Sequence, residues 1–460
     1  MSSIELAKLI HPEIRSMLLA GEVEGIREVC SEIHGADLVH LADEFDSEQQ
    51  LAFFEALSTE QRIELFQYLP FERQSDLLGR VSVDVRQSVL NGLNSDDRAR
   101  FVEQLPAEES HQVLSELTPK ERQFTMDVLK HEERSAGRLM TPECLIIKAG
   151  STVEEAFATI RMVAAHVETV YVAYVVDNIG VLVGTVSLRD LLKARSTEII
   201  SDIMTANSVS ADVSVDQEEL ARTMKKYDLL AIPITAEKGR LVGIVTFDDI
   251  QDVIEEEASE DILRMHGVAA ETDSYFSASV AKKFRQRLVV LVSLAVVSVV
   301  SVLLQQEYNY LISQVSILAV YLTMLCGSSG NCGTQMAGII IRAQGLQGFN
   351  AAAFKKLIVK EVIVGLLMAS FMALAAVAVV FVRGVGPEAL GGHTVVEIAV
   401  VVGGAMFAAL TTINLLGGIM PIVMKKVGLD PAITAGPFIT TAADILTVLV
   451  YFNVARLLLG

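Results

Sequence analysis

The chain has 460 residues, enough for two to four domains, and its 37 Lys and Arg against 57 Asp and Glu give a net charge of −20. From Lys282 onward there are 12 basic and 6 acidic residues, so residues 1–281 hold the other 25 and 51 and carry −26, against +6 for the later part. A strongly acidic first part argues against nucleic-acid binding and favours cations as partners.

The cysteines and the N-terminus narrow the class further. Cys30, Cys144, Cys326 and Cys332 form no CxxC and have no His-rich company, which argues against a disulfide framework and a zinc site. The N-terminus has no apolar region after a basic start, so we expect no signal peptide and a cytoplasmic location for residues 1–281. No Ser/His/Asp or Cys/His set and no P-loop stands out, so an enzyme is not expected.

A 12-residue period runs through the N-terminal part. Each unit opens with Ser, Asn, Thr or Pro and ends in Leu or Val, in the units 58–69, 70–81, 82–93, 94–105, 106–117 and 118–129. This pattern is typical of capped helix starts repeated once per unit. Such short helices are unstable alone, so we expect an all-α superhelix over residues 1–132. Two interpretations stay open: a scaffold without a site, or acids such as Asp96 and Asp97 that face another domain and bind a cation with it.

Residues 133–255 contain two copies of one α/β pattern. Leu139-Met140-Thr141-Pro142 is echoed by Ile203-Met204-Thr205-Ala206, and the copies end in Gly-x-x-Ser/Thr-x-x-Asp at 184–190 and 243–249. The order of features resembles a pair of CBS domains. The resemblance implies that the closing hydroxyl and carboxylate of each copy can hold the ribose of ATP or another adenine nucleotide, here Ser187 with Asp190 and Thr246 with Asp249. The same residues also serve as plain helix caps in this fold, so both interpretations stay open.

The second copy runs into an acidic helix. Eight acids lie within residues 248–261, with no base until Arg264. Like charges at i+3 and i+4 repel by a few tenths of a kcal/mol per pair unless a cation sits among them. Hard oxygen ligands without His or Cys suit Mg²⁺ or Ca²⁺ better than zinc or copper, and the alternative is a solvated charged face. We expect residues 256–287 to form a long, plug-like connecting helix followed by a basic collar at 282–287.

The remainder, 288–460, is predicted to be a five-helix transmembrane domain. Apolar stretches long enough to cross a bilayer lie at 288–304, 309–327, 357–382, 394–424 and 431–459. If the first span starts inside, the inner segments hold most of the basic residues and the outer ones hold only Arg383 and Arg456. The positive-inside rule then predicts a multi-pass protein of the cell inner membrane with cytoplasmic N-terminal domains and the C-terminus outside.

Two features of this domain carry chemistry. Residues 327–335 are Gly-rich, which allows close backbone approach and frees carbonyls where the segment lines a cavity; a plain loop or close helix contact is the alternative. Asp444 lies near the middle of the last span, behind Gly436-Pro437, which we expect to break the helix. A carboxylate at this depth costs about 2.5–3.5 kcal/mol on insertion scales, so it is expected to mark an ion pathway or to pack between helices.

Taken together, the order of domains resembles the MgtE family of magnesium channels. The motifs that carry the resemblance are Ser-Gly-Asn-Cys-Gly-Thr-Gln at 329–335 and Asp-Pro-Ala, Gly-Pro-Phe and Thr-Thr-x-x-Asp within 430–444. Ser329 and Cys332 depart from the residues common in the family, which bears on selectivity among Mg²⁺, Mn²⁺ and Co²⁺.

The resemblance implies a homodimer in the lipid bilayer, with a pore on its two-fold axis. Each subunit would give Asp444 to a Mg²⁺ site in the pore, near the pore-loop residues Gly330, Asn331, Gly333 and Gln335. It also implies that the cytosolic part senses Mg²⁺ and serves Mg²⁺ homeostasis. The sensing carboxylates would be Asp216, Glu218, Asp228, Asp249, Asp252, Glu257, Glu260, Asp261 and Asp430. The competing hypothesis is a CBS-regulated secondary transporter of another solute.

Overall fold

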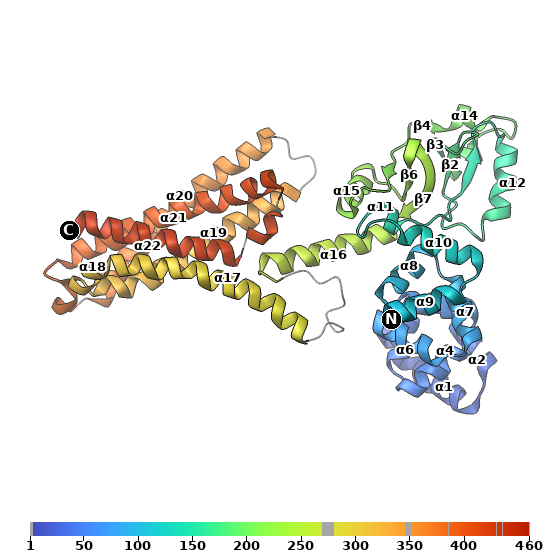
Figure 1. Cartoon of the computed structure of the whole chain (residues 1–460), viewed down its shortest axis with the longest axis horizontal. Helices are drawn as coiled ribbons and strands as arrows, with labels where there is room; N and C mark the ends of the chain where they lie inside the picture. The colour runs from blue at the N-terminus through green and yellow to red at the C-terminus, as the bar shows by residue number, and fades with distance from the viewer. Residues whose placement is uncertain are drawn as a thin grey trace. The chain divides into compact units, whose positions relative to one another are not determined.

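The computed structural model describes residues 3–268, 280–345, 351–384, 386–428, 430–434 and 436–459. The chain divides into two compact units, Met1–Glu255 and Glu256–Gly460. The first unit holds the short helices and the α/β module, and the second holds the long apolar helices (Figure 1).

The short helices of the first unit repeat with the predicted period. The residues that precede α2 to α10 are Glu22, His34, Asp46, Ser58, Pro70, Ser82, Asn94, Pro106 and Thr118, each 12 residues after the last. The period therefore begins three units earlier than the sequence pattern indicated. The helices are α1 Ser3–Ala20, α2 Val23–Cys30, α3 Gly35–Asp43, α4 Ser47–Ala56, α5 Thr59–Gln67, α6 Phe71–Arg80, α7 Val83–Gly92, α8 Ser95–Gln104, α9 Ala107–Glu116, α10 Pro119–Leu129 and α11 Ala136–Leu139.

A second repeat, of side chains, joins these helices. In six of the nine units, one Arg or Gln donates to the carbonyl eight residues before it, at the end of the preceding helix; these are Gln50, Arg62, Gln74, Arg86, Arg98 and Arg122. The last carbonyls of a helix lack intrahelical partners, so each of these contacts satisfies a helix end and fixes the angle to the next helix. Leu, Val and Phe side chains, including Phe53, Phe54 and Phe66, fill the core between the helices.

The α/β module has two small sheets. One has the order β1-β2-β3-β4 and the other β5-β6-β7; in each, the first pair is parallel and the second antiparallel. The strands are β1 Ile146–Lys148, β2 Val172–Val176, β3 Leu182–Ser187, β4 Thr205–Ala206, β5 Ala211–Asp212, β6 Ala231–Ala236 and β7 Arg240–Thr246. The helices are α12 Val153–Val163, α13 Leu188–Lys193, α14 Ile200–Ile203, α15 Gln217–Tyr227 and the 3₁₀ turn η1 Glu237–Gly239.

The echoed Met-Thr pairs explain why the two copies belong together. Thr141, which precedes the first sheet, exchanges backbone hydrogen bonds with Ile244 of the second sheet, and Thr205, which leads into the second copy, pairs with β3 of the first. Both crossings need a glycine. A Cβ on Gly184 would come within 2.6 Å of the carbonyl oxygen of Thr205, and a Cβ on Gly243 within 2.6 Å of that of Thr141. The predicted CBS pair is therefore an exchanged pair of sheets.

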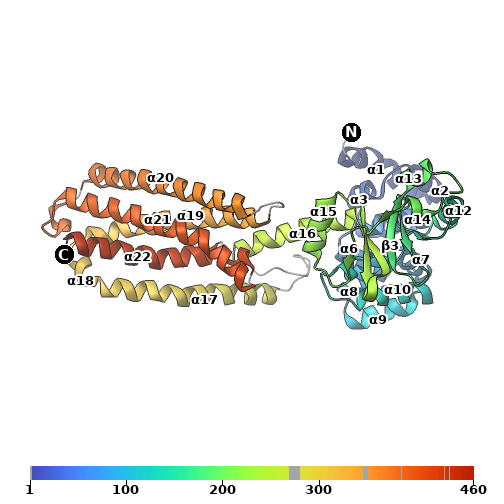
Figure 2. The same ribbon diagram turned by 90° about the horizontal axis from the view of Figure 1, so that it is seen from above.

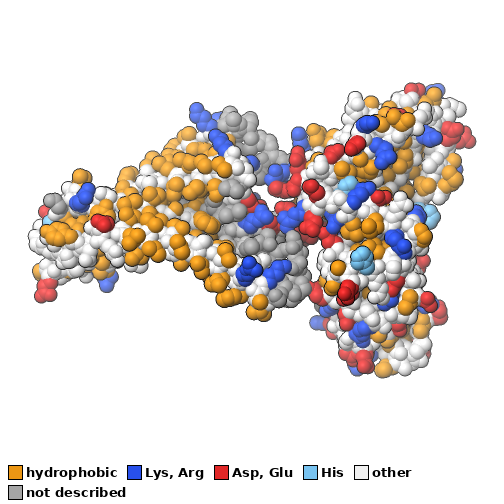
Figure 3. All heavy atoms as spheres, in the orientation of Figure 1, with side chains coloured by type: hydrophobic (Ala, Val, Ile, Leu, Met, Phe, Trp, Pro, Cys, Tyr) orange, Lys and Arg blue, Asp and Glu red, His pale blue; other side chains and the backbone are white. Residues whose placement is uncertain are grey.

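The second unit is a bundle of long apolar helices that run side by side in both ribbon views (Figures 1 and 2). The connecting helix α16, Phe247–Met265, crosses the boundary between the units. The other elements are α17 Val280–Glu307, α18 Asn309–Gln314, α19 Ile317–Gly345, α20 Ala351–Arg383, η2 Pro387–Leu390, α21 Val395–Val427, η3 Pro431–Thr434 and α22 Pro437–Leu459. Hydrophobic side chains dominate the face of these helices seen in Figure 3, as expected for a surface that meets lipid.

The predicted number of five spans is not exact. Four helices of the described chain are long and apolar enough to cross a membrane: α17, Phe354–Arg383 of α20, α21 and α22. The second predicted span, 309–327, is divided between α18 and the start of α19. Helix α19 has the length to span, but its Gly, Ser, Asn and Gln residues lower its hydropathy.

The Gly-rich stretch 327–335 is helical, which corrects the expectation of a loop or freed carbonyls there. It lies inside α19, so its carbonyls accept ordinary helical hydrogen bonds. Close approach, the other expectation, is observed: a Cβ on Gly417 of α21 would lie 2.5 Å from the carbonyl oxygen of Gly333. The predicted break at Gly436-Pro437 is also observed, because α22 begins at Pro437 and the predicted span 431–459 is interrupted before it.

Candidate functional site

In the first unit, the structure brings acids from three distant segments together. Asp96 and Asp97 open α8, Asp248 and Asp249 open α16, and Glu168 lies in the loop after α12; these five residues are called the acidic cluster. Sequence reasoning named Asp96, Asp97 and Asp249 but missed Glu168, since a single Glu in a loop carries no motif. Among the described residues, no three His, Cys, Asp or Glu side chains form a group that could hold a metal ion.

The electrostatics of the acidic cluster favour a positive partner. Burial, followed by repulsion from Asp249, raises the pKa of Glu168 to about 7, and burial together with repulsion from Asp248 and Asp97 raises the pKa of Asp249 to about 6. Burial also raises the pKa of Asp96, with Asp249 the largest of the repelling charges. One oxygen of Asp96, Oδ1, is buried without a hydrogen-bond partner in the described structure. A cation entering the acidic cluster would offset the repulsion between its carboxylates and would give the buried Asp96 Oδ1 a partner.

Two contacts partly offset the repulsion. The Gln67 amide donates to Asp97 Oδ2 at 2.9 Å, and the Arg100 guanidinium lies 3.6 Å from Asp252 Oδ2. Arg100 is the nearby base that α8 supplies, and Asp252 sits one turn after Asp248 on α16. Asp252 of α16 is therefore paired with a base of α8.

The residues expected at the nucleotide site bond to each other in this structure. Ser187 donates to Asp190 Oδ2 at 2.5 Å and accepts from the Asp190 backbone amide, capping α13. Thr246 donates to Asp249 Oδ2 at 2.6 Å at the start of α16. Both pairs have the geometry of a helix cap. In each pair the hydroxyl and the carboxylate lie next to each other, as binding to a ribose diol would require.

The acids of α15 stand apart from the acidic cluster in their bonding. Asp216 caps the helix by accepting from the Glu218 amide at 2.9 Å, and Glu218 pairs with Arg222 one turn on. Asp228 ends the helix in the left-handed conformation, with φ of 51°. Each residue thus has a local structural role.

In the second unit, the end of α16 is bound to the segment before α22. Arg264 forms ion pairs with Glu260, one turn back, and with Asp430. Asp430 also accepts from the Ala432 amide at 2.8 Å, and Met265 packs against the pair Ala337 and Ile439. Arg264, which the sequence showed only as the base that ends the acidic run, therefore joins two predicted sensor acids. Glu257 is partly buried and Asp261 is exposed on the same helix.

Asp444 lies on α22, half-buried, against α19. The Cys326 thiol of α19 lies close to its carboxylate. The two helices are antiparallel here: the Tyr451 hydroxyl donates to the Leu318 carbonyl at 2.9 Å, and Gly330 faces Thr440. Sequence reasoning missed Cys326, which looked like an ordinary apolar residue of the second span.

The predicted pore-loop residues divide between two faces of α19. Gly330 and Gly333 are buried against α22 and α21, whereas Asn331 and Gln335 are exposed. Thr323, Gly327, Asn331 and Gln335 recur every four residues and are all exposed, so they form one stripe along the helix, called the α19 polar stripe.

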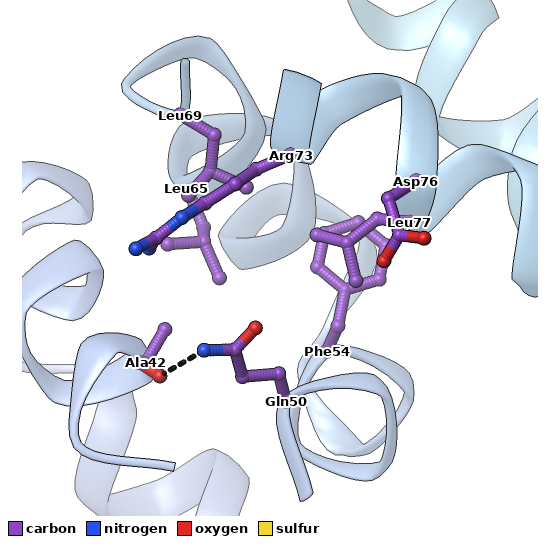
Figure 4. A pocket seen from close by; sticks show the side chains of 8 residues that line it. All are labelled: Ala42, Gln50, Phe54, Leu65, Leu69, Arg73, Asp76 and Leu77. Carbon is purple, nitrogen blue, oxygen red and sulfur yellow. Dashed lines mark hydrogen bonds between the residues drawn. The ribbon is translucent and has the colours of Figure 1, made fainter. Parts of the chain in front are cut away.

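A cavity in the helical part of the first unit is too small to be a ligand site. Its volume is about 30 Å³, and it lies between α3 and α6 (Figure 4) with a lining of Ala42, Gln50, Phe54, Leu65, Leu69, Arg73, Asp76 and Leu77. Gln50 donates across it to the Ala42 carbonyl at 3.0 Å. This volume suits a water molecule and excludes a nucleotide.

Family models match most of the chain, in four segments. Residues 322–454 match the model of the MgtE divalent cation transporter family, residues 33–134 that of the MgtE intracellular N domain, and residues 136–197 and 200–256 that of the CBS domain. The first of these matches covers α19 to α22, where Asp444 and the α19 polar stripe lie.

Named relatives agree. The chain is 38% identical over 331 residues to the magnesium transporter MgtE of Enterococcus faecalis, covering 72% of this chain and 70% of the relative, and 36% identical over 330 residues to that of Thermus thermophilus, covering 72% and 71%. A crystal structure of the cytosolic domain of the Mg²⁺ channel MgtE in complex with ATP matches 53% of this chain and 99% of its own, with 36% identity and a TM-score of 0.50. Family members are transporters rather than enzymes, as predicted. The chain belongs to the MgtE family of divalent cation transporters.

Proposed function

We propose that this chain conducts Mg²⁺ across the cell inner membrane, with Asp444 at the selective point of the path. The observation that carries the proposal is the position of Asp444, about two turns into a 23-residue apolar helix and beside Cys326 of α19. An ionisable group at this depth faces a wet cavity or a partner rather than lipid. The name of the relatives, magnesium transporter, supports Mg²⁺ as the ion.

The α19 polar stripe supports a path that a second copy of the chain completes. Four exposed polar or Gly positions on one helix face are unsuited to lipid, because their hydrogen-bonding groups need water or protein. A homodimer whose two stripes face each other would enclose a polar channel and bring two Asp444 carboxylates near it. Mg²⁺ loses its water reluctantly, so a site with few carboxylates and room for a hydration shell suits its passage.

The first unit, Met1–Glu255, is called the soluble unit from here on. We place it in the cytoplasm, where it would regulate the ion path. The acidic cluster and the acids of α15 and α16 offer hard oxygen ligands. Mg²⁺ beside Glu168 and Asp249 would relieve the repulsion that, together with burial, raises the pKa of these two carboxyls. The ion then favours the compact, closed arrangement, and its loss favours the open one. ATP at Ser187, Asp190, Thr246 and Asp249 is a second regulatory ligand, supported by the ATP complex of the related cytosolic domain.

The pore proposal is tested by replacing Asp444 in the full-length chain. Asp444→Ala should fail to restore growth of a magnesium-uptake-deficient strain at low Mg²⁺, while the protein still reaches the membrane. Glu397→Gln is the matched control, since Glu397 caps the start of α21 and a Gln keeps that capping bond. Growth on Asp444→Ala equal to that on the unchanged chain would exclude an essential carboxylate at this position.

A further inference from the structure

The antiparallel packing of α19 against α22 determines which residues of the two helices lie opposite each other, including Cys326 and Asp444. Cys326 lies four residues before Gly330, and Asp444 lies four residues after Thr440. Thr440 faces Gly330, because a Cβ added to Gly330 would lie 3.4 Å from Thr440 Cγ2. About two turns beyond Cys326 and Asp444, in the direction away from Gly330, the Tyr451 hydroxyl donates to the Leu318 carbonyl at 2.9 Å. The antiparallel pairing of α19 and α22 thus sets the thiol and the carboxylate opposite each other, on the two sides of one contact.

A second observation, about one turn to either side of this contact, points to an unseen polar ligand. Ser329 and Thr447 are fully buried, and neither hydroxyl has a hydrogen-bond partner in the described structure. Ser329 follows Cys326 by three residues on α19, and Thr447 follows Asp444 by three on α22, so each hydroxyl neighbours one member of the pair. Buried hydroxyls without partners call for water or an ion nearby.

We infer that Cys326 is a specificity-determining residue of the ion path, one that admits thiophilic divalent cations such as Cd²⁺ to the Asp444 position, where they block Mg²⁺ flux. The inference rests on the proposed role of Asp444 in that path. Mg²⁺ prefers oxygen ligands and water and leaves the protonated thiol untouched, whereas a soft cation binds thiolate. On Cd²⁺ binding the S–H bond breaks, the proton passes to water, and Cd–S and Cd–O bonds form to Cys326 and Asp444 without any change of oxidation state.

The chain supplies its own control cysteine. Cys332 lies six residues further along the same helix, is only 5% exposed, and has its Sγ 3.9 Å from both the Leu410 carbonyl and Asn414 Oδ1. It packs against α21 rather than α22, away from Asp444. The remaining cysteines, Cys30 and Cys144, are buried in the soluble unit.

The test is Cd²⁺ inhibition of Mg²⁺ flux into liposomes that contain the full-length chain. Each variant is compared with its own flux in the absence of Cd²⁺. We expect the half-inhibiting Cd²⁺ concentration to rise at least tenfold in Cys326→Ser and in Cys326→Ala, and to stay unchanged in Cys332→Ser. Equal Cd²⁺ sensitivity in the unchanged chain and both Cys326 variants would overturn the inference.

A binding measurement separates this inference from the pore proposal. A full-length variant whose only cysteine is Cys326 should show the ultraviolet absorbance of a cadmium–thiolate bond on Cd²⁺ addition, and Asp444→Asn in that background should weaken the binding. If Asp444→Ala retains full Mg²⁺ flux, the pore proposal fails, whatever Cd²⁺ does. If Asp444→Ala abolishes flux but Cys326 gives no cadmium signal, only the present inference fails.

Discussion

Arg98 is the most deeply buried charge of the helical domain, and its partners explain why it is tolerated there. Its guanidinium donates to the Leu90 and Leu93 carbonyls at 2.9 and 3.0 Å and forms an ion pair with Glu121 at 2.6 Å. Removing one partner of such a buried network leaves the others unsatisfied.

We therefore predict that Arg98→Met lowers the free energy of unfolding of the soluble unit by about 3–5 kcal/mol. Arg122→Met is the matched control, because Arg122 holds the same place in its repeat, donates to the Leu114 carbonyl at 2.6 Å, and is exposed. Its cost should stay near about 1 kcal/mol. Chemical denaturation of the two variants measures both values, and equal losses would contradict the role of burial.

Gly417 controls how closely α21 and α19 pack. Gly417→Ala would place its Cβ 2.5 Å from the Gly333 carbonyl oxygen, so the helices must separate, and we predict a lower melting temperature of the full-length chain in detergent. Gly404→Ala, on the same helix, meets only a Val454 methyl at 4.0 Å and should leave the melting temperature nearly unchanged. Thermal unfolding of the two variants in detergent tests this prediction. An unchanged melting temperature in Gly417→Ala would show that the two helices separate at little cost.

At the scale of elements, the end of α16 is the feature with the clearest mechanical role. Arg264 holds Glu260 on its own helix and Asp430 before α22, so a side chain of the protein supplies the positive charge at a place where Mg²⁺ was expected. If α16 keeps the pore shut, this ion pair favours closure without any bound metal.

Arg264→Ala should then raise the Mg²⁺ concentration that halves channel flux. Coupling free energies of about 1–3 kcal/mol correspond to about 5- to 150-fold, and a partly exposed pair belongs at the low end. Flux recorded against internal Mg²⁺ measures the shift. Lys130→Ala, which breaks an exposed pair with Asp127 at the end of α10, is the control and should leave the midpoint unchanged. An unshifted midpoint in Arg264→Ala would exclude the pair from gating.

The sequence predicted these elements unevenly, for physical reasons. Caps recur in the helical repeat as Ser, Thr, Asn or Pro, so six units were readable, whereas Glu22, His34 and Asp46 vary too much in type to reveal the earlier ones. Residues 327–335 are rich in Gly, which favours loops in isolation, but packing against α21 and α22 keeps them helical. Packing against the neighbouring helices therefore determines the conformation of this stretch, and no local sequence pattern predicts that packing.

At the scale of the whole molecule, the acidic cluster links stability to pH and to divalent cations. The folded pKa of Glu168, about 7, and of Asp249, about 6, both lie above the usual carboxyl range, so the folded state holds these protons more tightly than the unfolded one. The stabilisation is present at low pH and is lost as the pH rises through about 6 to 7.

Without divalent cations, the melting temperature of the soluble unit should therefore rise as the pH falls from 8 to 5.5. Mg²⁺ should raise it mainly at the higher pH, because the ion replaces the protons. Calorimetry of the full-length chain with and without millimolar Mg²⁺ tests this, and Asp96→Asn with Asp249→Asn should flatten the pH dependence. Parallel pH profiles with and without Mg²⁺ would contradict a cation site in the acidic cluster.

The residues of the candidate site could be predicted from the sequence only in part. Asp444 stood out because a carboxylate in an apolar helix is costly. Glu168, Cys326 and Arg264 did not, since each gains its meaning from a neighbour that lies 81 to 166 residues away in the chain, and one sequence read alone carries no signal of such pairing.

The exchange of Thr141 and Thr205 between the two sheets has a consequence for dissecting the protein. A chain cut between residues 197 and 200 would leave each half with a strand that belongs to the other and with an open sheet edge, which invites aggregation. Neither half should be soluble alone, yet the two expressed together should reassemble, so this module is suited to split-protein complementation.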